Sequence, residues 1–149
     1  MIDGVKLVPR IRHADDRGYV TEVLRADEEH FQKFGQAYVT ACHPGVVKAW
    51  HKHNTQTDYF YVVRGTMKVG LYDDREGSAT QGQYGVVILG ENGHEAQLVI
   101  PPGIWHGMMA LGDFAVMLNI PTEVYDRDQP DEMRAAWDAF DDIWTVKNR

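Results

Sequence analysis

Three histidines and one aspartate are spaced so that they can share one site. His51 and His53 lie two residues apart in a predicted β-strand, and a period of two places both imidazole rings on the same face. A turn then leads to Asp58, at the start of the next predicted strand, and His106 follows a sharp Pro/Gly bend. Imidazole and carboxylate groups suit Zn, Fe, Mn, Ni or Cu, so these residues predict a divalent-metal site of unspecified metal.

The elements that must position these side chains are predicted to be short β-strands. Eight segments rich in Val, Ile, Tyr and Phe are predicted as strands: residues 18–24, 37–42, 46–53, 59–64, 66–72, 85–89, 96–100 and 114–120. Turn residues such as His43-Pro44-Gly45 and Glu91-Asn92-Gly93 separate them. Many short strands at this spacing are typical of a sandwich or barrel, so we expect an all-β fold.

Two segments are predicted as helices. Residues 27–34 carry acidic residues in their first turn and are followed by Gly35, a frequent helix stop. Residues 130–140 begin with a proline and two acidic residues, and an apolar stripe with helical spacing follows, formed by Met133, Ala136, Trp137 and Phe140. We expect the apolar stripe of this short C-terminal helix to pack against the barrel or a partner subunit.

Length and composition limit the classes of protein. The 149 residues predict a single domain, residues 1–149, and 44% hydrophobic with 25% charged residues is ordinary for a soluble protein. No apolar run is long enough for a membrane helix, and no secretion signal is visible. The lone Cys42 rules out an intramolecular disulfide and fits the cytoplasm, and the net charge of -7 argues against a nucleic-acid partner.

The histidine segment resembles the cupin superfamily. Residues 45–65 match the first cupin motif, G-x5-H-x-H-x4-E-x6-G, with Asp58 at the glutamate position, and Pro101-x-Gly103-x-x-His106 matches the start of the second. Within the superfamily, residues 8–138 resemble the dTDP-4-dehydrorhamnose 3,5-epimerase family. The matching stretches are residues 17–22, 36–51, 71–82, 100–107 and 119–125, then Pro130-Asp131-Glu132 and Trp137-Asp138. This resemblance implies a homodimeric jelly roll, a double-stranded β-helix.

The resemblance also implies an epimerase acting on a nucleotide-linked 4-keto-6-deoxy sugar, with no required cofactor. His51 would be the base that removes a proton from the carbon next to the ketone. Lys48 replaces an arginine that contacts the nucleotide diphosphate, and Arg17 and Glu22 would serve the nucleotide end, across the dimer interface. The substrate-binding residues implied in this way are Arg17, Glu22, Gln36, Lys48, His106 and Asn119.

The sequence departs from the family at the groups that would move protons. The family's general-acid tyrosine aligns with Asn119, and an amide cannot donate a proton as a phenol can. The family's lysine after the histidine turn aligns with Asp58, which reverses the charge, and the aspartate that orients the family's histidine has no counterpart. Donor candidates for the opposite face of the sugar are Tyr38, Tyr59 and Tyr61.

Two alternatives to the epimerase therefore stay open. The complete ligand set of His51, His53, Asp58 and His106 indicates a metal-dependent cupin isomerase, lyase or dioxygenase acting on another small carbonyl compound. The missing acid tyrosine instead favours a sugar-nucleotide-binding cupin without catalysis. The residues specify neither the sugar, the nucleotide nor the metal, and resemblance in fold alone does not decide function.

Overall fold

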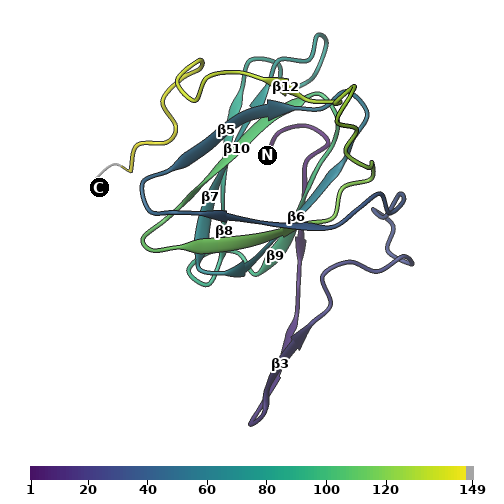
Figure 1. The fold of residues 1–149 in the computed structure, drawn as a ribbon, viewed down its shortest axis with the longest axis vertical. Helices are drawn as coiled ribbons and strands as arrows, with labels where there is room; N and C mark the ends of the chain where they lie inside the picture. Colours follow the sequence, from purple (N-terminus) through teal and green to yellow (C-terminus); the bar gives the residue numbers. More distant parts are fainter. Residues whose placement is uncertain (147–149) are drawn as a thin grey trace.

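Two five-stranded β-sheets face each other in the computed structural model, which describes residues 1–146 (Figure 1). The first sheet contains, in spatial order, Lys6–Pro9 (β1), Ala96–Ile100 (β9), Asp58–Arg64 (β6), Ala115–Asn119 (β11) and Tyr38–Cys42 (β4). The second contains Met133–Arg134 (β12), Val47–Lys52 (β5), Ile104–Ala110 (β10), Thr66–Asp73 (β7) and Tyr84–Gly90 (β8). Neighbouring strands are antiparallel, and the chain passes back and forth between the sheets, as in a jelly roll.

The hydrophobic core lies between the two sheets. Strand β10 is buried along its whole length, and β6 is buried over its first five residues. Large apolar side chains with at most 2% exposure meet there, namely Phe60, Met67, Leu71, Leu98, Ile104 and Met117. Each such side chain contributes about 1.5–3 kcal/mol when it leaves water, so this cluster fixes the spacing of the sheets that hold the candidate site.

The predicted all-β class is confirmed. Each of the eight segments predicted as strands contains one, with bounds that differ by a few residues. Strand β10 was not predicted, because His106 and Gly107 interrupt its apolar run and resemble a continuation of the preceding bend. The strand nevertheless lies in the middle of the second sheet, between β5 and β7.

The short C-terminal helix predicted at residues 130–140 is wrong. The segment instead begins with an extended stretch whose strand β12 pairs with β5. Ala135 and Trp50 exchange two backbone hydrogen bonds of 3.0 and 3.1 Å, and the Trp50 indole donates to the carbonyl of Trp137 at 3.1 Å. Backbone groups bonded to a sheet edge cannot also form helical bonds, so the sheet edge overrides the helical periodicity.

The helix predicted at residues 27–34 is also wrong, because the segment forms successive turns. The Phe31 N–H donates to the Glu28 carbonyl at 3.0 Å, and the next N–H, of Gln32, donates to the Tyr59 hydroxyl at 3.2 Å. The contact with Tyr59 anchors the turn to the first sheet. Residues 1–146 contain no helix, and so none long and apolar enough to span a membrane.

The segment after β12 covers the outer face of the second sheet. Trp144 is 3% exposed and packs against Trp50 with ring centroids 4.9 Å apart. Gly70 of β7 makes room for this indole, because a Cβ added at Gly70 would lie 2.6 Å from Trp144. Phe140, from the apolar stripe, contacts Trp50 edge-on, whereas Trp137 of the same stripe is 55% exposed.

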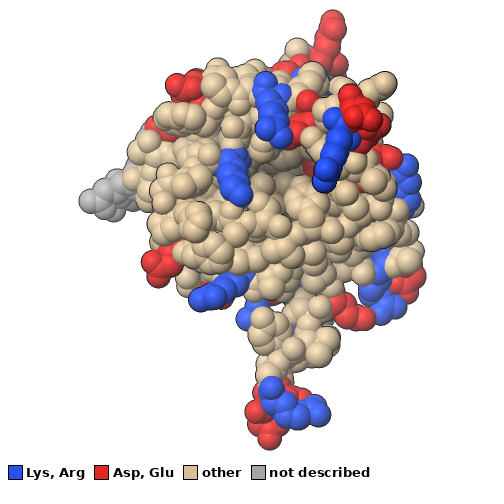
Figure 2. All heavy atoms as spheres, in the orientation of Figure 1, with Lys and Arg blue, Asp and Glu red and all other residues tan. Residues whose placement is uncertain are grey.

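A hairpin projects from the sandwich. It consists of Arg12–Asp15 (β2) and Gly18–Thr21 (β3), and it extends well beyond both sheets (Figure 1). Charges of both signs gather at its tip (Figure 2), while Ile11, Tyr19 and Val20 expose 70%, 53% and 65% of their surface. Exposed apolar side chains on a projecting element are typical of a surface that meets another chain.

Candidate active site

A cavity of about 600 Å³ is lined by both sheets and by the segment after β11. Its volume suits a small organic ligand. Residues given a role in the sequence analysis that line it are Gln36, Tyr38, Lys48, His51, His53 and His106. The cavity also contains residues to which the sequence analysis assigned no role, namely Thr40, Glu123, Tyr125, Gln129, Glu132 and Arg134.

A β-bulge in β5 brings Lys48 and His51 to the cavity together. Side chains three residues apart face opposite sides of a regular strand. The pairing with β10 shifts between His106↔His51 and Met108↔Lys48, which gives β5 one residue more than its partner. This extra residue returns Lys48 to the side of His51, as bulges do. The cavity therefore has a cation beside an imidazole.

Gly107 of β10 lies against the bulged part of β5. A Cβ added at Gly107 would lie 2.3 Å from the Cβ of Ala49 and 2.9 Å from the carbonyl oxygen of Lys48. No real side chain tolerates such distances, so only glycine permits the two strands to approach this closely. The approach sets how near the histidines of the two strands come.

His51 is placed as a neutral base. Burial, and then the neighbouring His106, lower its pKa to about 4 against the opposing effect of Glu132. The imidazole is therefore uncharged at neutral pH, with a nitrogen lone pair free to accept a proton. Glu132 Oε1 lies 3.8 Å from Nε2 of His51 and can stabilise the imidazolium that proton transfer would create. The sequence predicted Glu132 in the first turn of the helix at residues 130–140. The structure brings it beside His51 because β12, which follows it directly, pairs with β5.

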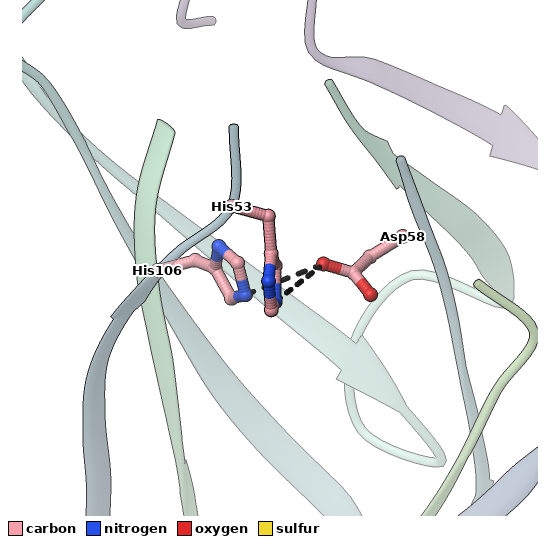
Figure 3. A group of neighbouring side chains, drawn as sticks. All are labelled: His53, Asp58 and His106. Atoms are coloured by element: carbon pink, nitrogen blue, oxygen red, sulfur yellow. Dashed lines mark ion pairs between the residues drawn. The ribbon is translucent and has the colours of Figure 1, made fainter. Parts of the chain in front are cut away.

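His53, Asp58 and His106 converge on one point (Figure 3). Asp58 Oδ2 lies 3.6 Å from Nε2 of His53 and 3.4 Å from Nε2 of His106. These separations exceed a hydrogen bond, and Oδ2 has no hydrogen-bond partner within residues 1–146 although Asp58 is only 1% exposed. His51 lies outside the group, so the structure brings together three of the four predicted metal ligands.

The hydrogen bonds of these two imidazoles determine which nitrogen is free. Nδ1 of His53 contacts the Asp131 carbonyl oxygen, and Nδ1 of His106 lies 3.0 Å from the Ile104 carbonyl oxygen. A carbonyl only accepts, so each Nδ1 carries the proton and each Nε2 presents a lone pair toward Asp58. Two imidazole lone pairs and one unpaired carboxylate oxygen fit a divalent cation.

Asn119 lies beneath the cavity wall and orients its neighbours. It is fully buried, and its Nδ2 donates to Asp58 Oδ1 at 2.7 Å and to the Tyr38 hydroxyl oxygen at 3.0 Å. Its Oδ1 accepts from the Tyr59 N–H at 3.1 Å. A carboxylate only accepts and a backbone N–H only donates, so the orientation of this amide is fixed. Asn119 was predicted to bind substrate, and the structure places it behind Tyr38.

The three donor tyrosines differ in where their hydroxyls lie. The Tyr59 hydroxyl donates to the His30 carbonyl at 2.9 Å, and the Tyr61 hydroxyl donates to Glu95. Tyr38 lines the cavity. Burial, and then the nearby carboxylates, raise the pKa of Tyr38, so its phenol is protonated at neutral pH.

Asp131 holds the loop that carries His53. Its carboxylate accepts from the N–H groups of Asn54 and Thr55 at 2.9 Å and from that of Gln56 at 3.2 Å. The Thr55 hydroxyl adds a fourth bond of 2.7 Å. Burial opposes ionisation, but these hydrogen bonds outweigh it and lower the pKa of Asp131 to about 2. The loop is therefore bonded to the segment that ends in β12.

Arg17 and Glu22 lie on the projecting hairpin and just after it. Arg17 pairs with Asp15, and Glu22 pairs with Arg25 at 2.8 Å. Within residues 1–146, neither Arg17 nor Glu22 is among the residues that line the cavity of its own chain.

Comparisons with known proteins agree on one group. A family model described as dTDP-4-dehydrorhamnose 3,5-epimerase matches residues 1–146. The spore coat polysaccharide biosynthesis protein SpsL of Bacillus subtilis is 42% identical over 139 residues, which cover 93% of this chain and 91% of that protein. The probable low-salt glycan biosynthesis epimerase Agl13 of Haloferax volcanii is 42% identical over 130 residues, covering 85% and 82%.

A solved structure is similar over almost the same range. The crystal structure of a dTDP sugar isomerase from Desulfovibrio desulfuricans G20 superposes with a TM-score of 0.86 and 34% identity, covering 93% of this chain and 87% of that one. The jelly roll expected from the sequence is thereby confirmed.

Replacing Asp131 by alanine is expected to lower the free energy of unfolding at pH 7 by about 2 kcal/mol, since charge-assisted bonds to the loop are lost. The folded-state pKa of about 2 lies below the ordinary 3.8, so this contribution is present above pH 4 and disappears as the pH falls toward 2. Urea unfolding at pH 7, 5 and 3 measures it. Asp128→Ala, at an exposed position of the same segment, is the control. A difference from wild type that is the same at pH 3 as at pH 7 contradicts the assignment.

Proposed function

The chain belongs to the dTDP-4-dehydrorhamnose 3,5-epimerase family, and we propose that it is an isomerase that epimerises a nucleotide-linked 4-keto-6-deoxy sugar at a carbon next to the ketone. The observation that carries this proposal is a neutral imidazole, His51, in a cavity of about 600 Å³ with a carboxylate behind it. A second feature in support is Lys48, which the bulge in β5 places in the same cavity.

The chemistry begins with a weakly acidic hydrogen. His51 removes the proton from the carbon next to the ketone, the electron pair of the C–H bond forms a C=C bond, and the ketone becomes an enolate. Return of a proton to the opposite face of that carbon re-forms the ketone with inverted configuration. Both steps move only protons, so acid and base groups suffice and no cofactor is required.

The nucleotide end of the substrate needs cationic and hydrogen-bonding groups. Lys48 and Gln36 line the cavity, and an ammonium group suits a diphosphate. Arg17 and Glu22 serve this end from a second copy, because the hairpin projects beyond both sheets (Figure 1) and neither residue lines the cavity of its own chain. The functional unit is therefore a homodimer.

We place the protein in the cytoplasm, where a buried free thiol such as Cys42 stays reduced.

Replacing His51 by asparagine is expected to slow both epimerisation and solvent-deuterium uptake by about 10²–10⁴-fold, since a general base contributes this much. The base must be unprotonated, so kcat/KM of the wild type should hold from pH 7 to pH 5 and fall below about pH 4. NMR of a dTDP-linked 4-keto-6-deoxy sugar in D₂O measures both rates. His94→Asn, at an exposed histidine, should behave as wild type. If the wild type incorporates no deuterium into any dTDP-linked 4-keto-6-deoxy sugar, the proposal is refuted.

The dimer proposal predicts complementation between two inactive variants. Arg17→Ala and His51→Asn should each be nearly inactive, but subunits mixed after mild denaturation should recover about a quarter of wild-type activity, because half of the dimers are mixed and each contains one intact site. Sedimentation should give twice the 17.0 kDa of one chain. A monomer in solution, or a mixture that recovers nothing, contradicts a shared site.

A second candidate function is a metal-dependent cupin enzyme acting on another small carbonyl compound. The observation that favours it is the unpaired Asp58 Oδ2 facing the free nitrogens of His53 and His106. These three residues would hold the ion, which supplies Lewis-acid polarisation of a carbonyl oxygen when bound.

Metal content separates the two candidates. If the three residues form a metal site, the purified protein should contain about one equivalent of a divalent transition metal and Asp58→Asn should contain little, as measured by mass spectrometry and by the absorption spectrum of added Co²⁺. Asp126→Asn, which changes another carboxylate of the cavity, is the control. Activity lost on chelation favours the second candidate, and epimerase activity that persists in metal-free protein refutes it.

A further inference from the structure

An epimerase that inverts a carbon needs a proton acceptor on one side of the reacting carbon and a donor on the other. His51, the proposed base, belongs to β5 of the second sheet. A donor on the opposite face of the sugar must come from another wall of the cavity, and the first sheet supplies part of that lining through Tyr38, Thr40 and Phe60. The residue types that can donate at neutral pH include the phenol of tyrosine.

Tyr38 is a tyrosine of the first sheet that lines this cavity. It belongs to β4, and its register partner in the pairing of β11 with β4 is Asn119. Asn119 is the position at which the family resemblance places the acid tyrosine. The phenol therefore lies one strand to the side of the expected position, with its oxygen 3.0 Å from the Asn119 side chain.

The fixed orientation of the Asn119 amide determines what the phenol can do. Nδ2 donates to the Tyr38 oxygen, so the hydroxyl hydrogen of Tyr38 is not used in this bond and remains available to the cavity. The same N–H would stabilise the phenolate left after donation, as a preorganised donor does at a developing oxyanion. Asn119 is held in turn by Asp58 Oδ1 and by the Tyr59 N–H.

We propose that Tyr38 of β4 is the catalytic acid. It takes the place of the family's acid tyrosine, whose aligned position in this chain is Asn119 of the neighbouring strand β11, and Asn119 is its positioning residue. This inference rests on the proposed epimerase function. As the enolate re-forms the ketone, the C=C electron pair takes the hydroxyl proton of Tyr38 on the face opposite His51. The products of the step are inverted substrate, a Tyr38 phenolate and a His51 imidazolium. One proton then passes from the imidazolium to the phenolate through solvent, which restores the enzyme.

The test separates proton removal from inversion. In D₂O, Tyr38→Phe should lose about 10²–10³-fold in the rate of inversion, while deuterium uptake at the same carbon falls less than about tenfold, because His51 still removes and returns a proton on its own face. His51→Asn should lose both. Tyr61→Phe, whose hydroxyl binds Glu95, is the matched control and should keep both rates.

A second variant tests the positioning role. Asn119→Leu should show the same signature, reduced inversion with retained deuterium uptake, and the double variant with Tyr38→Phe should lose no more inversion than Tyr38→Phe alone. Retained deuterium uptake also shows that each variant is folded, because a purely structural defect would abolish deuterium uptake together with inversion. Additive losses in the double variant would contradict the coupling between the two residues.

The outcomes distinguish this inference from the function on which it rests. Wild-type inversion together with unchanged inversion in Tyr38→Phe would overturn the assignment and leave the epimerase intact. Loss of inversion in Tyr125→Phe instead, at the other tyrosine that lines the cavity, would do the same. If the wild type neither exchanges nor inverts a dTDP-linked 4-keto-6-deoxy sugar, both proposals fail together.

Discussion

Burying a carboxylate is costly unless its neighbours donate hydrogen bonds to it, and Asp58 is only 1% exposed. One oxygen is satisfied by the side chains of Gln56 and Asn119 at 2.8 and 2.7 Å. The other faces two imidazole nitrogens at distances too long for hydrogen bonds. Within residues 1–146, only one of the two carboxylate oxygens is hydrogen-bonded. The neighbouring amides must therefore point their N–H groups toward Asp58, which fixes their orientation.

The constraint extends to both walls of the cavity. Asn119 must turn its amide nitrogen toward Asp58, and this leaves its other N–H for Tyr38. On the opposite side, the imidazoles of His53 and His106 are held by backbone carbonyls through Nδ1. Asp58 therefore lies between the Asn119–Tyr38 pair of the first sheet and the imidazoles of His53 and His106, so a change at Asp58 alters the surroundings of both groups.

Sequence patterns predicted the parts of the site that depend on local spacing. The period of two placed His51 and His53 in one cavity, and the strand segments around them were found because β-branched and aromatic residues dominate them. The bond between Asn119 and Tyr38 joins residues 81 positions apart, so no local pattern reveals it. Glu132 was missed for a related reason: helical periodicity does not show that an open sheet edge will capture the segment.

The bulge in β5 affects how such a site can diversify. In a regular strand, successive side chains alternate between the two faces, so the face of one residue determines the faces of all the others. The extra residue between Lys48 and His51 resets this alternation. Insertions or deletions at that point can exchange the cation of the cavity without turning the histidines, so the groups that hold the substrate and the groups that transform it can be selected separately.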